Sequence, residues 1–335
     1  MRLLRKTCRR VVFPMIVAVR GDKILQKTTD HSILNIMYHG VVSENSNYFS
    51  PRHLTKEQFE RHLKYFRKEY DIVTIREALE YKRNGFRPGK KTISVSFDDG
   101  YLNNMINALP LLEEYNIKAT FFITGVCTEE LDIRALWPDI VGCMKYFYND
   151  EIIEIEGMRF VRFRDIRTNI SLVDFIKKLE PAGRDRIMNY LVDKYGLRDK
   201  IKEIPEEIWR IMNKQELTIF ASSDLVEIGS HGYSHCNLAN VDISIAGDEL
   251  VKSKSLLQDA VGREVNSIAF PDGSYNSRIK DIARETGYQY QYAVDYLLEE
   301  DITDPGILNR HGISCTTTYE ANILLMNYSF HTKGI

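Results

Sequence analysis

Two acidic residues stand side by side in the segment SVSFDDG, residues 94–100. Asp98 and Asp99 follow an apolar alternation that is typical of a buried strand, and they precede a glycine. Adjacent carboxylates repel each other, and apolar surroundings disfavour their ionised forms. A divalent cation would reverse this balance, because it favours the ionised form of both groups. The pair is therefore a candidate metal site, although a turn that caps a helix has the same kind of sequence.

The segment HGYSH places His231 and His235 four residues apart. If this segment turns helically, both imidazoles point to the same side and reach a common ion. Such a pair alone is common on protein surfaces. Joined by a carboxylate at a strand end, it forms a catalytic metal site with positions left for water and substrate. One aspartate of the pair would then bind the metal, and the other would take a proton from water.

Strand and helix patterns alternate along most of the chain. Strands are expected within 33–41, 71–75, 91–97, 118–125, 224–235, 265–273 and 289–295, and helices near 54–70, 75–85, 101–117, 243–260 and 277–286. This alternation predicts a parallel sheet or an α/β barrel. In such folds the carboxyl ends of the strands carry the chemistry. The polar residues expected at those ends are His39, Asp98, Asp99, His231, Asp272 and Asp295.

Residues 128–216 interrupt this rhythm with charged, helix-prone sequence. We interpret them as a mostly helical insertion with one hairpin around 151–164. The predicted organisation is a basic and apolar N-terminal segment, 1–30, followed by a catalytic domain, 31–330, that contains this insertion.

The composition is ordinary for a soluble globular protein, with 44% hydrophobic and 27% charged residues among 335. A formal net charge of −2 argues against a nucleic-acid partner, which usually requires a basic excess. The five cysteines form no CxxC pair, so a reducing compartment is the simpler inference.

The N-terminal segment carries five basic residues in its first ten and then the apolar run Val11–Val19. This run is too short to cross a bilayer. Two interpretations remain open, a peripheral contact with an anionic membrane and a basic helix packed on the domain. We therefore expect a cytoplasmic protein, which would be membrane-associated if the N-terminal segment contacts an anionic membrane.

Three motifs together resemble a known family. Phe97–Gly100 and the HGYSH segment are similar to the first two motifs of the polysaccharide deacetylases, the NodB-homology group or carbohydrate esterase family 4. The segment FPDGSY resembles the third motif. The resemblance implies a distorted (β/α) barrel and removal of N-acetyl groups from a sugar. It also implies that Asp98 is the catalytic base, while Asp99, His231 and His235 hold zinc or another divalent metal.

The third motif implies a substrate and oxyanion site at Pro271, Asp272 and Tyr275, with the backbone N–H of Asp272 as donor. The family usually has an arginine there that braces the base, and this chain has none. Arg310 is a candidate for the missing charge, and a surface arginine is the alternative.

Two further roles rest on weaker matches. The segment IMYHG, residues 36–40, resembles relatives in which an N-terminal histidine is the general acid, which would be His39 here. Asp295 is a candidate for the fourth motif and would support the site.

The predicted substrate is an N-acetylated glycan, with a lipid-linked sugar in surface-glycan assembly as one candidate. The tyrosines considered for stacking on sugar rings are Tyr233, Tyr275, Tyr288, Tyr290 and Tyr292. The alternatives are an iron oxygenase, which uses the same two histidines and one carboxylate, and a non-catalytic glycan-binding relative. An oxygenase usually carries its ligands on an antiparallel barrel, whereas this pattern is α/β.

Overall fold

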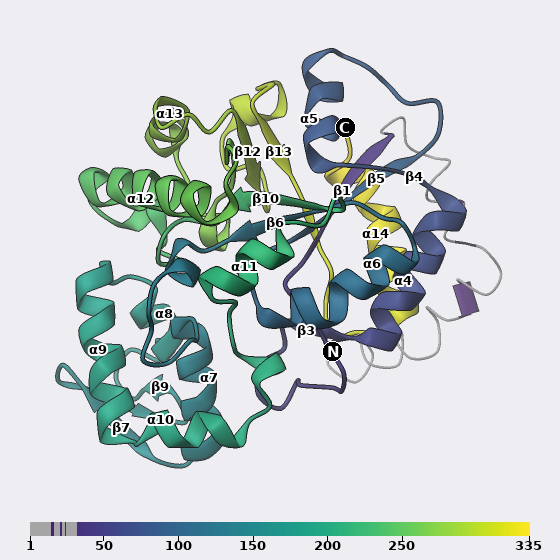
Figure 1. The fold of residues 1–335 in the computed structure, drawn as a ribbon. Coiled ribbons are helices and arrows are strands. Elements are labelled where there is room, and N and C mark those ends of the chain that lie inside the picture. Colours follow the sequence, from purple (N-terminus) through teal and green to yellow (C-terminus); the bar gives the residue numbers. More distant parts are fainter. Residues whose placement is uncertain (1–14, 17–20, 22–23, 25–31) are drawn as a thin grey trace.

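The computed structural model describes residues 15–16, 21, 24 and 32–335 (Figure 1). The N-terminal segment predicted over 1–30 lies almost wholly outside these residues, so its membrane contact stays a prediction. In the described part of the chain, no helix is long and apolar enough to cross a membrane.

One large sheet forms the centre of the fold. Its strands are β1 (Ile33–Tyr38), β4 (Asp71–Val73), β5 (Thr92–Phe97), β6 (Ala119–Ile123), β10 (Val226–Ser230), β11 (Ser267–Ala269), β12 (Tyr290–Ala293), β13 (Ile307–Asn309) and β14 (His311–Gly312). The order is β13-β12-β11-β10-β6-β5-β1-β14, and β4 also pairs with β5. Every pairing in this sheet is parallel.

The sheet nearly closes on itself at Arg310. This residue alone separates β13, which pairs with β12, from β14, which pairs with β1. The two ends of the strand order are therefore joined by one short stretch of chain. The predicted distorted (β/α) barrel is confirmed, although β13 and β14 were not among the predicted strands.

Helices surround this barrel (Figure 1). They are α4 (Lys56–Glu69), α5 (Ile75–Arg83), α6 (Leu109–Glu114), α11 (Lys214–Phe220), α12 (Ile243–Val261), α13 (Ser277–Glu285) and α14 (Tyr319–Thr332). Thr55 caps α4 together with Gln58. The helix predicted over 101–117 is instead a π-helix, η2 (Asn104–Ala108), followed by α6, with Pro110 in the first turn of α6. Helix α14 was not predicted.

Short elements complete the barrel and its loops. Strands β2 (Gly40–Val42) and β3 (His53–Thr55) form a separate parallel pair. The 3-10 turns are η3 (Gly125–Thr128), η4 (Ile201–Glu203), η5 (Glu206–Ile208), η6 (Leu238–Asn240), η7 (Pro271–Gly273) and η8 (Glu299–Ile302).

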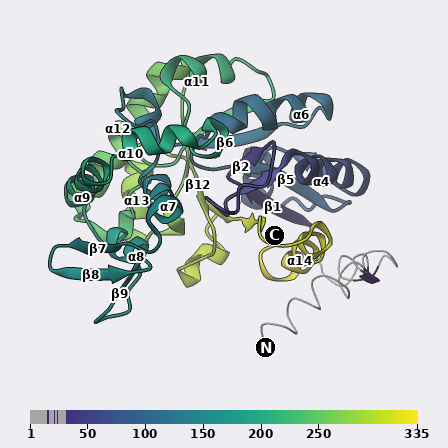
Figure 2. The same cartoon turned by 90° about the horizontal axis from the view of Figure 1, so that it is seen from below.

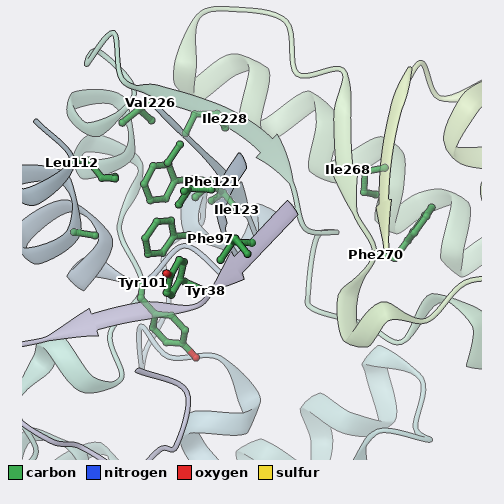
Figure 3. Packing of buried hydrophobic residues seen from close by; sticks show 14 of the residues in the cluster. Tyr38, Phe97, Tyr101, Leu112, Phe121, Ile123, Val226, Ile228, Ile268 and Phe270 are labelled. Atoms are coloured by element: carbon green, nitrogen blue, oxygen red, sulfur yellow. The ribbon is translucent and has the colours of Figure 1, made fainter. Parts of the chain in front are cut away.

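Aromatic rings fill the core directly behind the strand ends. The rings of Tyr38, Phe97 and Phe121 lie one above the other in Figure 3, with centroid distances of 5.3 and 4.8 Å. Phe220 of α11 meets Phe121 edge to face at 4.7 Å. Such contacts fix ring positions more narrowly than aliphatic packing does. They hold the ends of β1, β5 and β6 in place, and Asp98 follows Phe97 directly.

A lobe beside the barrel contains most of the predicted insertion (Figures 1 and 2). Its elements are α7 (Trp137–Tyr148), β7 (Ile152–Ile155), β8 (Met158–Val161), β9 (Arg164–Asp165), α8 (Leu172–Ile176), α9 (Pro181–Lys194) and α10 (Leu197–Lys200). Strands β7 and β8 form an antiparallel hairpin, and β9 adds a third strand. The lobe has its own buried cluster, with Ile153, Phe160, Leu172 and Leu191 among its members. We call residues 129–213 the lobe below.

Candidate metal centre and catalytic site

The structure brings the three predicted metal ligands together. Asp99 Oδ1 lies 3.5 Å from His231 Nε2 and 3.3 Å from His235 Nε2. One ligand atom from each residue lies within 4.8 Å of the others. Asp99 Oδ1 is buried and has no hydrogen-bond partner among the described residues. A buried carboxylate oxygen without a partner, facing two imidazole nitrogens, fits a divalent metal such as zinc.

The backbone around these ligands is unusual. Asp99 and His235 both have positive φ angles, of 80° and 55°, and Asp272 of the third motif has 55°. Residues other than glycine rarely adopt this conformation, and such strain concentrates at functional sites. The HGYSH segment is therefore a turn with Gly232 at φ 71°, and the conditional expectation of a helical arrangement is wrong. The two imidazoles still converge, with their ring centroids 5.1 Å apart.

The end of β6 braces both motif loops. Thr124 donates a hydrogen bond from Oγ1 to the carbonyl of Asp99 at 2.9 Å. The His231 N–H donates to the carbonyl of Ile123 at 2.8 Å. His231 Nδ1 lies 2.8 Å from the carbonyl oxygen of Ala269, so Nδ1 carries the proton and Nε2 is free to bind a metal.

Glu249 of α12 holds the turn between the two histidines, and sequence reasoning missed it. Its carboxylate accepts hydrogen bonds from the backbone N–H groups of Tyr233, at 3.1 Å, and Ser234, at 2.8 Å. It also accepts a 2.5 Å bond from the Ser234 hydroxyl. Glu249 is buried, so these bonds also compensate its charge. The only signal in the sequence is an acid on a mainly apolar helix face.

Asp98 lies beside the metal ligands and is clamped by Arg310. Two nitrogens of the guanidinium donate to the two carboxylate oxygens, at 2.6 and 2.9 Å. Both side chains are buried, at 0% and 4% exposure. Burial raises the pKa of Asp98, but the charge and hydrogen bonds of Arg310 outweigh this effect, so its pKa lies below the usual value. Asp98 is therefore held ionised and in one orientation.

Two other predicted residues lie near this centre. His39 follows β1, is half-buried, and acts electrostatically on the carboxyl groups of both Asp98 and Asp99. Asp272 lies in η7 after β11, directly behind Pro271, and its carboxylate pairs with Lys177 of the lobe at 2.6 Å. The lobe thus contacts the predicted oxyanion loop directly.

Several predicted sugar contacts are wrong. Tyr275 is 3% exposed, and its hydroxyl donates to Asp301 at 2.5 Å. Tyr288 and Tyr292 are fully buried. Tyr290 begins β12, at the end of the sheet away from the metal ligands. The rings of Tyr275, Tyr288 and Tyr292 pack in the core, where a large aromatic side chain is most often found, and Tyr290 is only partly buried against it.

The contacts found for the side chains of Asp295 and Tyr233 are with residues outside the metal cluster. The Asp295 carboxylate is 64% exposed and pairs with Lys333 at 2.6 Å. Tyr233 is half-buried, with the ammonium of Lys252 3.6 Å from its ring centre.

A charged cluster between barrel and lobe was also missed. Arg52 forms an ion pair with Asp139 of α7, and Tyr101 donates to the same carboxylate at 2.9 Å. Trp137, two residues before Asp139, donates from Nε1 to the carbonyl of His235 at 3.4 Å. The start of α7 therefore contacts a metal-ligand residue, and no sequence motif marks these residues.

The comparison with protein families identifies the chain. The polysaccharide deacetylase model matches residues 85–152 and 191–291, which together make up about half of the chain. The chain belongs to the polysaccharide deacetylase family. The gap in this match falls within the lobe.

Individual family members match over shorter stretches. A putative polysaccharide deacetylase, YxkH of Bacillus subtilis, is 35% identical over 91 residues, 27% of this chain and 31% of that protein. The poly-beta-1,6-N-acetyl-D-glucosamine N-deacetylase of Staphylococcus aureus is 33% identical over 118 residues, 31% of this chain and 40% of that protein. The matched regions thus span well under two thirds of these relatives.

Solved structures of the family have the same fold. IcaB from Ammonifex degensii superposes with a TM-score of 0.55 at 15% identity, covering 90% of this chain and 98% of that one. The deacetylase PplD of Streptococcus pyogenes gives 0.53 at 17% identity, covering 88% and 97%. At these identities the likeness concerns the barrel fold alone.

Proposed function

We propose that this family member is a metal-dependent hydrolase that removes N-acetyl groups from an N-acetylated glycan. The observation that carries the proposal is the ionised Asp98, clamped by Arg310, beside the buried cluster of Asp99, His231 and His235. Hydrolysis of an amide with water requires such a base next to an electrophilic centre.

Each residue has a distinct role in this reaction. Asp99, His231 and His235 would hold the metal, which when bound acidifies water and polarises the acetyl carbonyl. Asp98 accepts the proton of the attacking water, and Arg310 keeps its carboxylate ionised and aligned. The backbone N–H of Asp272 would donate to the developing oxyanion, a contribution typically worth about 10²–10³ in rate. His39 delivers a proton to the departing amine.

The substrate class follows from the relatives and from the site. One relative is named for poly-beta-1,6-N-acetyl-D-glucosamine, and we propose a related N-acetylhexosamine glycan in surface-glycan biosynthesis. The MYH segment that carries His39, together with the third motif without arginine, supports placement in the corresponding variant of the family. A lipid-linked form of the sugar, a membrane contact and a cytoplasmic location stay sequence-based predictions.

Single substitutions in metal-loaded protein test these roles. The substrate is a β-1,6-linked N-acetylglucosamine oligomer, and released acetate and bound zinc are both measured. Asp98→Asn should abolish turnover and keep the metal, whereas Asp99→Ala should lose both. His39→Ala should slow turnover without metal loss. Full activity of Asp98→Asn protein would exclude Asp98 as the base.

The two alternatives predict different results. An iron oxygenase would consume oxygen and release no acetate, and family membership argues against it. A non-catalytic glycan-binding relative would bind the oligomer and leave it intact. An exposed control, Arg278→Met, keeps the site unchanged and should behave as the wild type in every assay.

A further inference from the structure

A cavity of about 300 Å³ lies between the lobe and the turn that carries the metal-binding histidines. Tyr233 and Ser234 of that turn form part of its wall. Most of its lining is apolar, with Leu131, Ile140 and Met188 among the contributors. Its volume is at the lower end of the range for small-ligand pockets, about 300–1,000 Å³.

Arg184 of α9 lines this cavity, and its side chain is only 5% exposed. Its contacts found among the described residues are two distances of 3.4 Å, from Nε and Nη2 to one oxygen of Asp185. Strong bonds between a guanidinium and a carboxylate measure about 2.7–2.9 Å. The Asp185 side chain is 64% exposed, so it stays largely hydrated. Arg184 is therefore largely removed from water, and its ion pair with Asp185 is long and partly exposed.

Asp132, the other acid in the lining, does not supply a second counter-ion. Asp132 accepts a 2.5 Å bond from Arg198, outside the cavity, and is 62% exposed. A buried charge is strongly unfavourable unless it is paired or hydrogen-bonded. The cavity thus combines a desolvated cation with an apolar wall, and an anion with an apolar body complements both.

We propose that this cavity binds a small organic anion, a carboxylate or a phosphate monoester, through Arg184. The charged group of the ligand pairs with the guanidinium, and its aliphatic part packs on Leu131, Ile140 and Met188. The site is separate from the metal centre and does not depend on the proposed deacetylase activity. Its ligand would lie against Tyr233 and Ser234, between the two metal-binding histidines in sequence.

Calorimetric titration of the whole chain tests the proposal with three probes of equal chain length. Hexanoate and hexyl phosphate carry the two candidate head groups, and hexanol carries neither. We expect one-to-one binding of at least one anion at millimolar concentration, and the tighter of the two identifies the head group. Hexanol should bind at least tenfold more weakly, since a charge-assisted hydrogen bond contributes about 1.5–3 kcal/mol.

Two substitutions locate the site, and one serves as control. Arg184→Met should weaken anion binding tenfold or more, while Arg186→Met, the same change at a 71% exposed position of α9, should leave it unchanged. If Arg184→Met does not fold, Asn189→Trp, at an exposed position in the cavity lining, should block entry instead. Absence of anion binding, equal binding of hexanol, or unchanged binding in Arg184→Met or Asn189→Trp would overturn the proposal.

Discussion

Replacing Arg310 with methionine tests how the base is held. The guanidinium is fully buried and donates two bonds to Asp98, at 2.6 and 2.9 Å. Removing one partner of a buried ion pair leaves the other charge uncompensated, which costs about 3–5 kcal/mol. We expect the free energy of unfolding of Arg310→Met to fall by that amount. The free energy of unfolding of Arg310→Lys should lie between those of the wild type and Arg310→Met, because an ammonium keeps the charge and loses the bidentate geometry.

A double-mutant cycle separates this ion pair from the packing of the arginine stem. Asp98→Asn removes the charge at nearly constant volume. In that background Arg310→Met should destabilise much less, since no buried carboxylate is left unpaired. Urea unfolding followed by circular dichroism measures all four proteins, and bound zinc should stay at the wild-type level in each. An equal loss of stability in both backgrounds would refute the reasoning.

The same substitution has a catalytic consequence that rests on the proposed function. A carboxylate no longer fixed by Arg310 would sample positions away from the attacking water, and a displacement of about 1 Å is enough for a roughly 10²-fold loss. We expect kcat of Arg310→Met to fall by about this factor with little change in KM. Wild-type kcat in a folded Arg310→Met protein would show that the clamp has no catalytic role.

Four other outcomes follow from the structure. Zinc at a hundred times its Kd should stabilise the protein by about 2.7 kcal/mol in thermal unfolding, and Asp99→Ala should abolish this effect. Glu249→Gln should weaken zinc binding about 10- to 100-fold in a chelator competition; unchanged affinity would leave Glu249 without a role in the turn. Lys177 forms a partly exposed ion pair with Asp272 of the predicted oxyanion loop, and such a pair contributes up to about 1 kcal/mol. Lys177→Met should therefore lower kcat up to about fivefold, and Lys177→Arg should restore it. Burial lowers the pKa of His62 to about 3, so between pH 6.5 and 4 only the unfolded chain binds a proton at His62. As the pH is lowered through this range, the free energy of unfolding should therefore fall by up to about 1.4 kcal/mol per pH unit. His62→Gln should remove this contribution from the denaturation curves.

The motif residues were predictable because their chemistry is local in sequence. A strand followed by two aspartates and a glycine, and two histidines four apart, constrain a metal site even before their spatial relation is known. The strand ends were predictable for the same reason, since β1, β5 and β6 are short apolar runs. What the sequence left open was the exact path of the HGYSH turn, which depends on the positive φ of Gly232 and His235.

The residues that support the site were harder to find, because their partners are distant in sequence. Arg310 was a candidate only because the third motif lacks its arginine, and it meets Asp98 across 212 positions; Arg52, which was missed, meets Asp139 across 87. No periodicity or motif marks such pairs. The prediction that tyrosines stack on sugar rings was wrong for another reason, since a core position and a sugar-binding position favour the same aromatic ring. Only burial separates them, as for Tyr288 and Tyr292.

The closure of the barrel at Arg310 has a consequence for how the protein matures. The three metal-binding side chains, with Glu249 and the Ala269 carbonyl that orient them, are present once the chain has been synthesised as far as Ala269, whereas Arg310 follows 41 positions later in the printed sequence. A partly assembled barrel would thus hold its ion before its base is aligned. The metal would then bind early and stabilise the partly folded chain. Hydrolysis would begin only after β13 has paired with β12 and β14 with β1.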